Sequence, residues 1–176
     1  MEKINIAKLF GSEIKELIGL IRSSGKECYI VGGAVRDFLL KRKNSIDIDL
    51  TTALSVEELI KVFKKNKIDF DDRAIRYNCL TVSIQKRSLQ ITSFRKDIRT
   101  FGRTADVEHI ENIEEDAKRR DFTINAFYCS FNGEIIDPLG NLEDLNNKEL
   151  KFIGDPEARI IEDHLRILRF FRFVAV

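Results

Sequence analysis

The chain has 176 residues, of which 43% are hydrophobic and 34% are charged, and its formal net charge at pH 7 is +1. The apolar content is too high for an intrinsically disordered chain, and no apolar run is long enough for a transmembrane helix. A net charge this small argues against a protein that coats nucleic acid through bulk positive charge. Length and composition therefore indicate one globular domain, or one domain and the start of a second.

Cysteine usage and the start of the chain bear on its compartment. Cys28, Cys79 and Cys129 are far apart and each stands in apolar sequence, which predicts free, buried thiols in a reducing cytosol. No spacing of Cys and His is typical of a zinc site. The first residues lack the basic-then-apolar layout of a signal peptide. We therefore expect a cytoplasmic protein that has no membrane partner.

The first elements in chain order are a helix, a buried strand and a second helix. Residues 12–24 carry a helical stripe, with Ser12 as the expected N-cap, at Ile14, Leu17, Ile18 and Ile21. Residues 28–31 are apolar and β-branched and predict a buried strand. A turn at Gly32 and Gly33 follows, and then a helix to about residue 40.

The glycine turn has the composition of an anion-binding site. Gly32 and Gly33 allow backbone N–H groups to approach an anion at the start of a helix, where the helix dipole favours negative charge. Arg36, one turn into this helix, is predicted to bind a phosphate with its forked guanidinium. The alternative for Arg36 is a local ion pair with Asp37.

Two aspartates stand two residues apart in the next predicted strand. A period of two places Asp47 and Asp49 on one face and Ile46 and Ile48 on the other. Neighbouring carboxylates repel each other, and a divalent cation between them relieves the repulsion. Oxygen ligands with open positions suit Mg²⁺ bound together with substrate phosphates. Taken alone, such a pair is more often a solvated strand edge.

The middle of the chain predicts a helix, a hairpin and a loop. Ser55 and Glu58 form a capping-box pattern ahead of a helix with inward-facing Val56, Leu59, Ile60 and Phe63. Residues 79–85 and 88–94 alternate between apolar and polar, which predicts a hairpin beside the strand of the two aspartates. Residues 95–112 are highly charged and predict a long loop.

The last third predicts helices and one short hairpin. Residues 114–129 are expected to be helical into Arg119, Arg120 and Asp121, and Asn132-Gly133 is a strong hairpin-turn signal. A short helix from Asn141 and a helical segment over residues 156–176 complete the chain. Its apolar end predicts a protein partner or a homo-oligomer through the residues Phe170, Phe171, Phe173, Val174 and Val176.

Four stretches together resemble the signatures of one enzyme family. Residues 32–37 (GGAVRD), followed by 47–52 (DIDLTT), resemble the first signature of class II tRNA nucleotidyltransferases, which are the CCA-adding enzymes, and of bacterial poly(A) polymerases. Residues 119–126 (RRDFTINA) resemble their second signature, and 136–145 resemble the stretch after it. Residues 162–169 (EDHLRILR) resemble their nucleotide-selecting helix. The resemblance runs from about residue 29 to the last residue, in the family's order.

The resemblance implies a fold and a reaction. The fold is α+β, a DNA polymerase beta-like nucleotidyltransferase head with a small mixed sheet backed by helices over residues 1–150, followed by the first helices of an all-α neck over residues 151–176. The reaction is attack of an RNA 3′-hydroxyl on the α-phosphate of CTP or ATP, with Mg²⁺ as cofactor. CMP or AMP is thereby added to the 3′ end of tRNA.

The resemblance also assigns residues to three tasks. The metal ligands, which are also the catalytic residues, are Asp47 and Asp49. The triphosphate is held by Gly32, Gly33, Arg36 and Arg120. The incoming base and the phosphates are contacted by Asp163, Arg166, Arg169 and Arg172. Without the resemblance, a solvated helix face would be the interpretation of Arg166, Arg169 and Arg172.

The sequence departs from the family pattern in two places. It reads Tyr77-Asn78-Cys79 where the family usually has a His-Gly-Thr-like turn, and it has Gln90 where an acidic residue is common. If that acidic residue is a third metal carboxylate, this chain lacks it. Three alternatives stay open: a poly(A) polymerase, a truncated or split-gene head that needs a partner chain with the remaining domains, and a kanamycin-type small-molecule nucleotidyltransferase. The last would not need the second signature.

Overall fold

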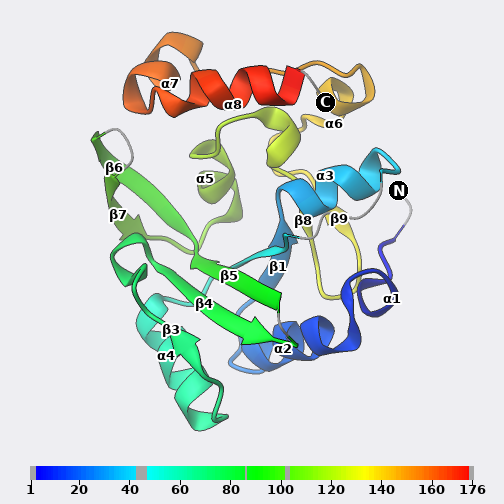
Figure 1. Ribbon diagram of the computed structural model, residues 1–176, viewed down its shortest axis with the longest axis vertical. Helices are drawn as coiled ribbons and strands as arrows, with labels where there is room; N and C mark the ends of the chain where they lie inside the picture. The colour runs from blue at the N-terminus through cyan, green and yellow to red at the C-terminus, as the bar shows by residue number, and fades with distance from the viewer. Residues whose placement is uncertain (1–2, 43–46, 86, 102–103, 175–176) are drawn as a thin grey trace.

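The computed structural model describes residues 3–42, 47–85, 87–101 and 104–174. A seven-stranded mixed sheet forms its centre, helices lie on both sides, and a separate two-stranded ribbon projects from one side (Figure 1). The α+β fold class predicted from the sequence is confirmed.

The sheet has the strand order β3-β4-β5-β2-β1-β8-β9. Its strands are β1 (Cys28–Val31), β2 (Asp49–Thr52), β3 (Phe70–Asp71), β4 (Cys79–Ile84), β5 (Arg87–Ser93), β8 (Tyr128–Cys129) and β9 (Ile135–Ile136). β2 and β5 run parallel, and the other neighbours run antiparallel. The ribbon consists of β6 (Arg95–Phe101) and β7 (Thr104–His109). The predicted hairpins at residues 79–94 and around Asn132-Gly133 are both present.

The helices are short and most of them lie on the periphery. They are α1 (Ile6–Phe10), α2 (Ser12–Arg22), α3 (Gly33–Leu39), α4 (Val56–Lys65), α5 (Ile113–Lys118), α6 (Leu142–Asn146), α7 (Pro156–Glu162) and α8 (Leu165–Val174). Two 3₁₀ turns are also present: η1 (Ile75–Tyr77) lies between β3 and β4, and η2 (Thr123–Asn125) lies between α5 and β8. In Figure 1, α2 and α4 lie on one side of the sheet, and α7 and α8 cross the opposite end of the molecule.

The main hydrophobic core lies between the sheet and α2 and α4. The predicted stripe of α2 is fully buried, although Ser12 is the first helical residue and Gly11 occupies the N-cap position. The capping box of α4 is present: Ser55 Oγ accepts from the backbone N–H of Glu58 at 3.2 Å, and the Glu58 carboxylate accepts from the backbone N–H of Ser55 at 2.8 Å. These local signals fix how both helices enter the core.

A second, smaller core lies on the other face of the sheet. It contains Val31, Phe94, Ala117, Ala126, Tyr128 and Ile153, with Tyr29 packed against it. Tyr29 stacks on Phe94 with ring centroids 6.1 Å apart and meets Tyr128 edge-on at 6.1 Å. This cluster places apolar bulk beside the face that carries Asp49, which reduces the access of water to that face.

The prediction of a long loop over residues 95–112 is wrong. Residues 95–101 and 104–109 pair antiparallel as the ribbon β6–β7, with a register shift between Asp97 and Arg99. The charged composition hid the strands, because their pairing rests on ladder hydrogen bonds and on polar contacts such as the ion pair Arg95–Asp97, and not on an alternating apolar face. Residues 102 and 103, between the two strands, lie outside the described residues.

Two predicted helices are shorter than expected. α5 ends at Lys118, and Phe122 is extended because its backbone bridges to Phe152 and its N–H is bound by the Asp121 carboxylate at 2.9 Å. The predicted helix over 156–176 is divided into α7 and α8 at Asp163, whose backbone is extended. Asp163 Oδ1 accepts from the N–H of Leu165 at 3.0 Å and so provides a hydrogen-bond partner for the first backbone N–H of α8.

The apolar end of the chain is partly covered. Phe170 and Phe173 pack against Phe122, with ring centroids 6.1 and 5.6 Å away, whereas Phe171 is 65% exposed. Val176 lies outside the described residues. No helix in the described ranges combines the length and the apolarity needed to cross a bilayer.

Candidate functional site

One row of residues crosses the sheet and organises the candidate site. Asp49 on β2 is in register with Gln90 on β5 and with Val31 on β1, and Val31 is in register with Tyr128 on β8. Residues in register on neighbouring strands project from the same face of a sheet. The row therefore places a carboxylate between an amide on one side and the second core on the other.

The predicted alternation around the two aspartates is present. Asp47 and Asp49 are exposed, whereas Ile48 and Leu50 are buried on the opposite face. Asp47 precedes β2, and Ile46, which the prediction placed in the strand, lies outside the described residues. The two carboxylates therefore share one open face of the sheet.

The Asp49 carboxylate lies in a setting that disfavours its charge. Surrounding protein atoms raise the pKa of Asp49 by desolvation, Arg120 opposes this rise, and the neighbouring charge of Asp47 adds to it. Although the side chain is open on one side, its immediate environment is therefore poorly hydrated. A divalent cation would offset both unfavourable effects.

The donor set fits Mg²⁺ bound together with a substrate. No group of three or more His, Cys, Asp or Glu side chains suited to a metal is found among the described residues. Mg²⁺ in nucleotide sites commonly takes one or two carboxylates and completes its shell with phosphates and water. Asp47 and Asp49 supply that number of carboxylates, and the Gln90 amide lies next to Asp49 in register.

The glycine turn lies between β1 and α3. Gly32 has φ +74°, a conformation that favours glycine, and its carbonyl accepts from the N–H groups of Val35 and Arg36. A Cβ on Gly32 would lie 4.0 Å from Nη1 of Arg120, and one on Gly33 would lie 3.6 Å from Nη2 of Arg36. The turn thus brings backbone from the first signature close to guanidinium groups of both signatures.

Arg120 is fixed by a buried acid and a buried phenol. Its Nε donates to the hydroxyl of Tyr128 at 3.0 Å, and its Nη2 donates to Asp116 Oδ2 at 3.1 Å. The Tyr128 hydroxyl also donates to Asp116 Oδ2, at 2.8 Å. Burial alone would lower the pKa of Arg120, but its interactions with Tyr128 and Asp116 outweigh this and raise it. The guanidinium is therefore held in place and remains charged.

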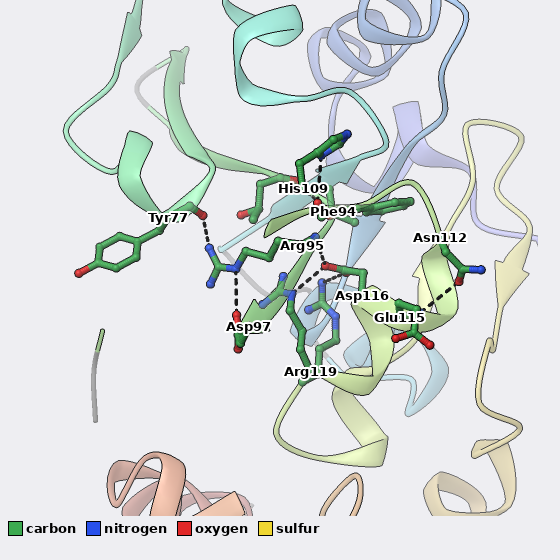
Figure 2. A network of polar contacts seen from close by, with 12 residues as sticks. Tyr77, Phe94, Arg95, Asp97, His109, Asn112, Glu115, Asp116 and Arg119 are labelled. Carbon is green, nitrogen blue, oxygen red and sulfur yellow. Dashed lines mark hydrogen bonds and ion pairs between the residues drawn. The ribbon is translucent and has the colours of Figure 1, made fainter. Parts of the chain in front are cut away.

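Asp116 is the centre of a network that joins α5 to the ribbon (Figure 2). Its carboxylate is fully buried and accepts from Nε of Arg119 at 2.8 Å, and it lies 3.5 Å from the N–H of Arg95. Burial by itself would raise the pKa of Asp116, but Arg119, Arg120 and the Tyr128 hydroxyl lower it. The Arg95 guanidinium donates to the carbonyl of Tyr77 and forms an ion pair with Asp97 at 3.7 Å.

The predicted triphosphate ligand Arg36 is tied into the protein. It forms the local ion pair with Asp37, at 2.8 Å, that the sequence offered as its alternative role. Nη1 of Arg36 also donates to Asn125 Oδ1 at 2.7 Å, and its guanidinium lies over the ring of Phe173, 5.0 Å from the centroid. Arg36 thus contacts the second signature and α8 as well as its own helix.

The residues predicted to read the base lie on or beside α8. Arg166 is buried and donates to Glu162 at 2.7 Å and to the carbonyl of Arg159, which directs it back onto α7. Asp163 lies between the two helices. Arg169 pairs with Asp121 at 2.6 Å and, like Arg120, opposes the rise in the pKa of Asp49 that desolvation causes. Arg172 contacts the ring of Phe173 and is exposed.

The structure gathers most of the predicted residues at one place. Asp47, Asp49, Arg120 and Arg169 interact electrostatically, and Gly32 lies beside Arg120. Arg166 and Asp163 are held by contacts within and beside α7 and α8. Sequence reasoning missed Asp116 and Tyr128 as supporting residues. Their only local signal is that they lie within ten residues of Arg119-Arg120, in or beside the second signature.

A cavity of about 450 Å³ borders this site between α3, α6 and α8. Arg36 and Phe173 belong to its wall, together with Arg42 and Lys148. Its size falls in the range of small-molecule sites. Arg36 therefore stands at the junction between the glycine turn and this basic, partly aromatic space.

Comparison with known proteins gives a consistent family assignment. The model of the Poly A polymerase head domain matches residues 28–151. The CCA tRNA nucleotidyltransferase 1, mitochondrial, of Homo sapiens is 38% identical over 166 residues, which cover 94% of this chain and 38% of the human protein. The kanamycin-type alternative receives no support from these matches.

Solved structures give the same result. The Bacillus stearothermophilus CCA-adding enzyme in complex with CTP superposes with a TM-score of 0.81 at 33% identity, covering 93% of this chain and 38% of that one. A tRNA nucleotidyltransferase complexed with a primer tRNA and an incoming ATP analog superposes with a TM-score of 0.67 at 31% identity, covering 89% and 44%. This chain thus spans well under half the length of these relatives.

Proposed function

The chain belongs to the family of class II tRNA nucleotidyltransferases, the CCA-adding enzymes, whose head is shared with poly(A) polymerases, and from this membership we propose that it carries the catalytic head of a template-independent RNA nucleotidyltransferase. CTP and ATP are its nucleotides, and the 3′ end of tRNA is its acceptor. Residues 1–150 form the head in this proposal, and residues 151–176 begin the neck. The cytoplasmic location stays a prediction from the sequence.

The proposed reaction joins an RNA 3′-oxygen to the α-phosphorus of the nucleotide and breaks the bond to the β-phosphate, which releases pyrophosphate. Such a transfer needs in-line positioning of the two oxygens and cations around the phosphates. The turn at Gly32 and Gly33 and the guanidinium of Arg120 would bind the triphosphate, with Arg36 beside them. Arg169 and Arg172 would support the nucleotide or RNA phosphates, and Asp163 and Arg166 would contact the base.

Magnesium, when bound at Asp47 and Asp49, would polarise the α-phosphate and lower the pKa of the attacking hydroxyl. The contribution of the chain is to hold the two carboxylates on one open face and to keep Arg120 charged and oriented. Asp116 and Tyr128 perform the second task through direct hydrogen bonds. Arg120 thereby presents a fixed positive charge to the face of Asp49.

The observation that carries the proposal is the placement of Asp47 and Asp49 on one face, with Arg120 and Arg169 acting on Asp49. The test is transfer of label from α-³²P-CTP or α-³²P-ATP to tRNA that lacks its 3′-terminal CCA, in the presence of Mg²⁺. We expect label to be incorporated at the 3′ end by the wild-type chain and to be abolished by Asp47→Ala and by Asp49→Ala. Labelling that persists in both variants would reject the assignment of the metal ligands.

Addition of AMP alone to RNA is the second candidate function, because the matched family model is that of the Poly A polymerase head domain. Separate reactions with each labelled nucleotide distinguish the two candidates. A CCA-adding head incorporates CMP into tRNA that lacks all three terminal nucleotides, whereas a poly(A) polymerase incorporates only AMP and continues beyond one residue.

A further inference from the structure

A chain of side-chain contacts links the glycine-turn helix α3 to α8. Nη1 of Arg36 donates to Asn125 Oδ1 at 2.7 Å, and Asn125 Nδ2 donates to Asp121 Oδ1 at 3.2 Å. The other oxygen of Asp121 accepts from Nε of Arg169 on α8 at 2.6 Å. Three segments that are far apart in the sequence thus share one polar connection with Asn125 at its middle.

The chemistry of the two neighbours requires a side chain at position 125 that both accepts and donates a hydrogen bond, as the Asn125 amide does. A guanidinium only donates hydrogen bonds and an ionised carboxylate only accepts them, so the residue between Arg36 and Asp121 must accept on one side and donate on the other. The amide orientation follows from these neighbours. An apolar side chain would break both contacts, whereas an aspartate would keep the contact with Arg36 and place a second carboxylate against Asp121.

Burial strengthens the connection. Asn125 is 6% exposed, and the side chains of Arg36 and Asp121 are 11% and 10% exposed, so these bonds are poorly screened by water. The end at Arg169 is more open. A second contact joins the same helices, because Arg36 and Arg169 both lie near the ring of Phe173, with their guanidinium carbons 5.0 and 5.7 Å from its centroid.

We propose that Asn125 is a positioning residue that couples the triphosphate side of the site at Arg36 to the docking of α8 through Asp121. The inference rests on the proposed function, since the triphosphate is the ligand assigned to Arg36. Coupling between two sites is reciprocal. A nucleotide that orders Arg36 therefore also holds α8 against the head, and a docked α8 improves nucleotide binding.

The first arm of the test measures hydrogen–deuterium exchange of the α8 amides without nucleotide. Loss of a hydrogen bond to a charged group corresponds to about tenfold in an equilibrium constant, so we expect α8 to exchange about tenfold faster in Asn125→Ala. The isosteric Asn125→Asp should also release α8. The matched control is Thr123→Val, which lies on the same 3₁₀ turn, is equally buried at 6%, and removes a hydroxyl that has no hydrogen-bond partner in the described part of the chain.

The amides of β1 and β2 serve as an internal reference. They should exchange at the wild-type rate in all variants, because a general loss of folding would speed them as well. Wild-type exchange of α8 in both Asn125 variants, with the reference unchanged, would overturn the proposal. Equal acceleration by Thr123→Val would also overturn it, since any buried change on the turn would then have the same effect.

The second arm repeats the exchange with saturating CTP and Mg²⁺. In the wild-type chain we expect CTP to slow exchange of α8, and in Asn125→Ala we expect this protection to be lost and the Kd for CTP to rise about tenfold. CTP binding that protects α8 equally in both proteins would contradict the coupling. A wild-type chain that binds no CTP would reject the proposed function instead, and the first arm would still decide whether Asn125 holds α8.

Discussion

Asp49 shows at the scale of a single residue how a functional group can oppose folding. Desolvation and the charge of Asp47 raise the pKa of its carboxyl, and Arg120 and Arg169 compensate only in part. For an acid with a raised folded-state pKa, the ionised form is less favourable in the folded than in the unfolded chain. Asp49 therefore lowers stability above the unfolded-state pKa of about 4, and this loss disappears as the pH falls below it.

The first prediction follows from the destabilising effect of the ionised Asp49 carboxylate. Asn at position 49 keeps the shape of the side chain and removes the charge, so Asp49→Asn should raise Tm in metal-free buffer at neutral pH and abolish nucleotidyl transfer. Added Mg²⁺ should raise Tm of the wild type but not that of the variant. The control is Asp69→Asn, an exposed aspartate outside the site, for which neither change is expected. A lower metal-free Tm in Asp49→Asn would contradict the electrostatic argument.

Gln90 gives the second prediction. The parallel register places it directly beside Asp49 on the same face. Gln90→Glu would add a third carboxylate there, and we expect the Kd for Mn²⁺, measured by titration followed by electron paramagnetic resonance, to fall about tenfold. Without metal, the variant should be less stable than the wild type, because a further negative charge then faces Asp49.

A matched control separates this local effect from a change in total charge. Ser83 is exposed on β4, which is separated from β2 by β5. Ser83→Glu adds the same charge two strands away and should leave the Kd for Mn²⁺ near the wild-type value. Equal tightening by both variants would show that Gln90 has no special position at the metal site.

At the scale of elements, one buried acid holds the ribbon, α5 and β8 together. Asp116 binds Arg119 and Arg120 and accepts from Tyr128, and it lies 3.5 Å from the backbone N–H of Arg95 at the start of β6. Several segments without a large apolar face of their own thus share one charged centre. Breaking such a buried pair leaves its partners as uncompensated charges.

The third prediction concerns this centre. Asp116→Asn should lower the free energy of unfolding by about 3 kcal/mol, whereas Glu115→Gln, next to it but in an exposed pair with Lys118, should change it little. The pKa of Asp116 is lowered in the folded chain, so its stabilisation is present above about pH 4 and is lost as the pH falls below that value. Denaturant unfolding from pH 3 to 7 should therefore show the difference between wild type and variant shrinking at the acid end.

Local signals account for the elements that the sequence predicts correctly. The capping box at Ser55 and the stripe of α2 depend on residues within a few positions of one another, and both are present. The ribbon was missed because its stability comes from distant partners such as Asp116, which the sequence shows only as part of an acidic run. The register of Asp49 with Gln90 depends on parallel pairing of β2 with β5, and no local pattern indicates this parallel direction. The break at Asp163 was hidden by helical periodicity on both sides.

At the scale of the whole molecule, α7 and α8 are bound to the head by two kinds of contact. Arg159 on α7 donates to the carbonyl of Arg120 at 2.6 Å and also to that of Arg119. Phe170 on α8 stacks on Phe152 with centroids 5.8 Å apart and interplanar angle 4°, and it also contacts Phe122. Because the carbonyls of Arg119 and Arg120 and the ring of Phe122 belong to the second signature, movement of α7 or α8 would act on the backbone segment that carries Arg120.

The fourth prediction separates the docked face of α8 from its free face. Phe170→Ala removes a ring that packs on the head and should weaken docking by about 2 kcal/mol, whereas Phe171→Ala removes a ring that is 65% exposed and should have little effect. Limited trypsin digestion reports docking, because Arg166, Arg169 and Arg172 all lie on α8. We expect cleavage there to accelerate at least tenfold in Phe170→Ala only. Equal acceleration in both variants would mean that general weakening of the helix, and not loss of its contact with Phe152 and Phe122, exposes these bonds.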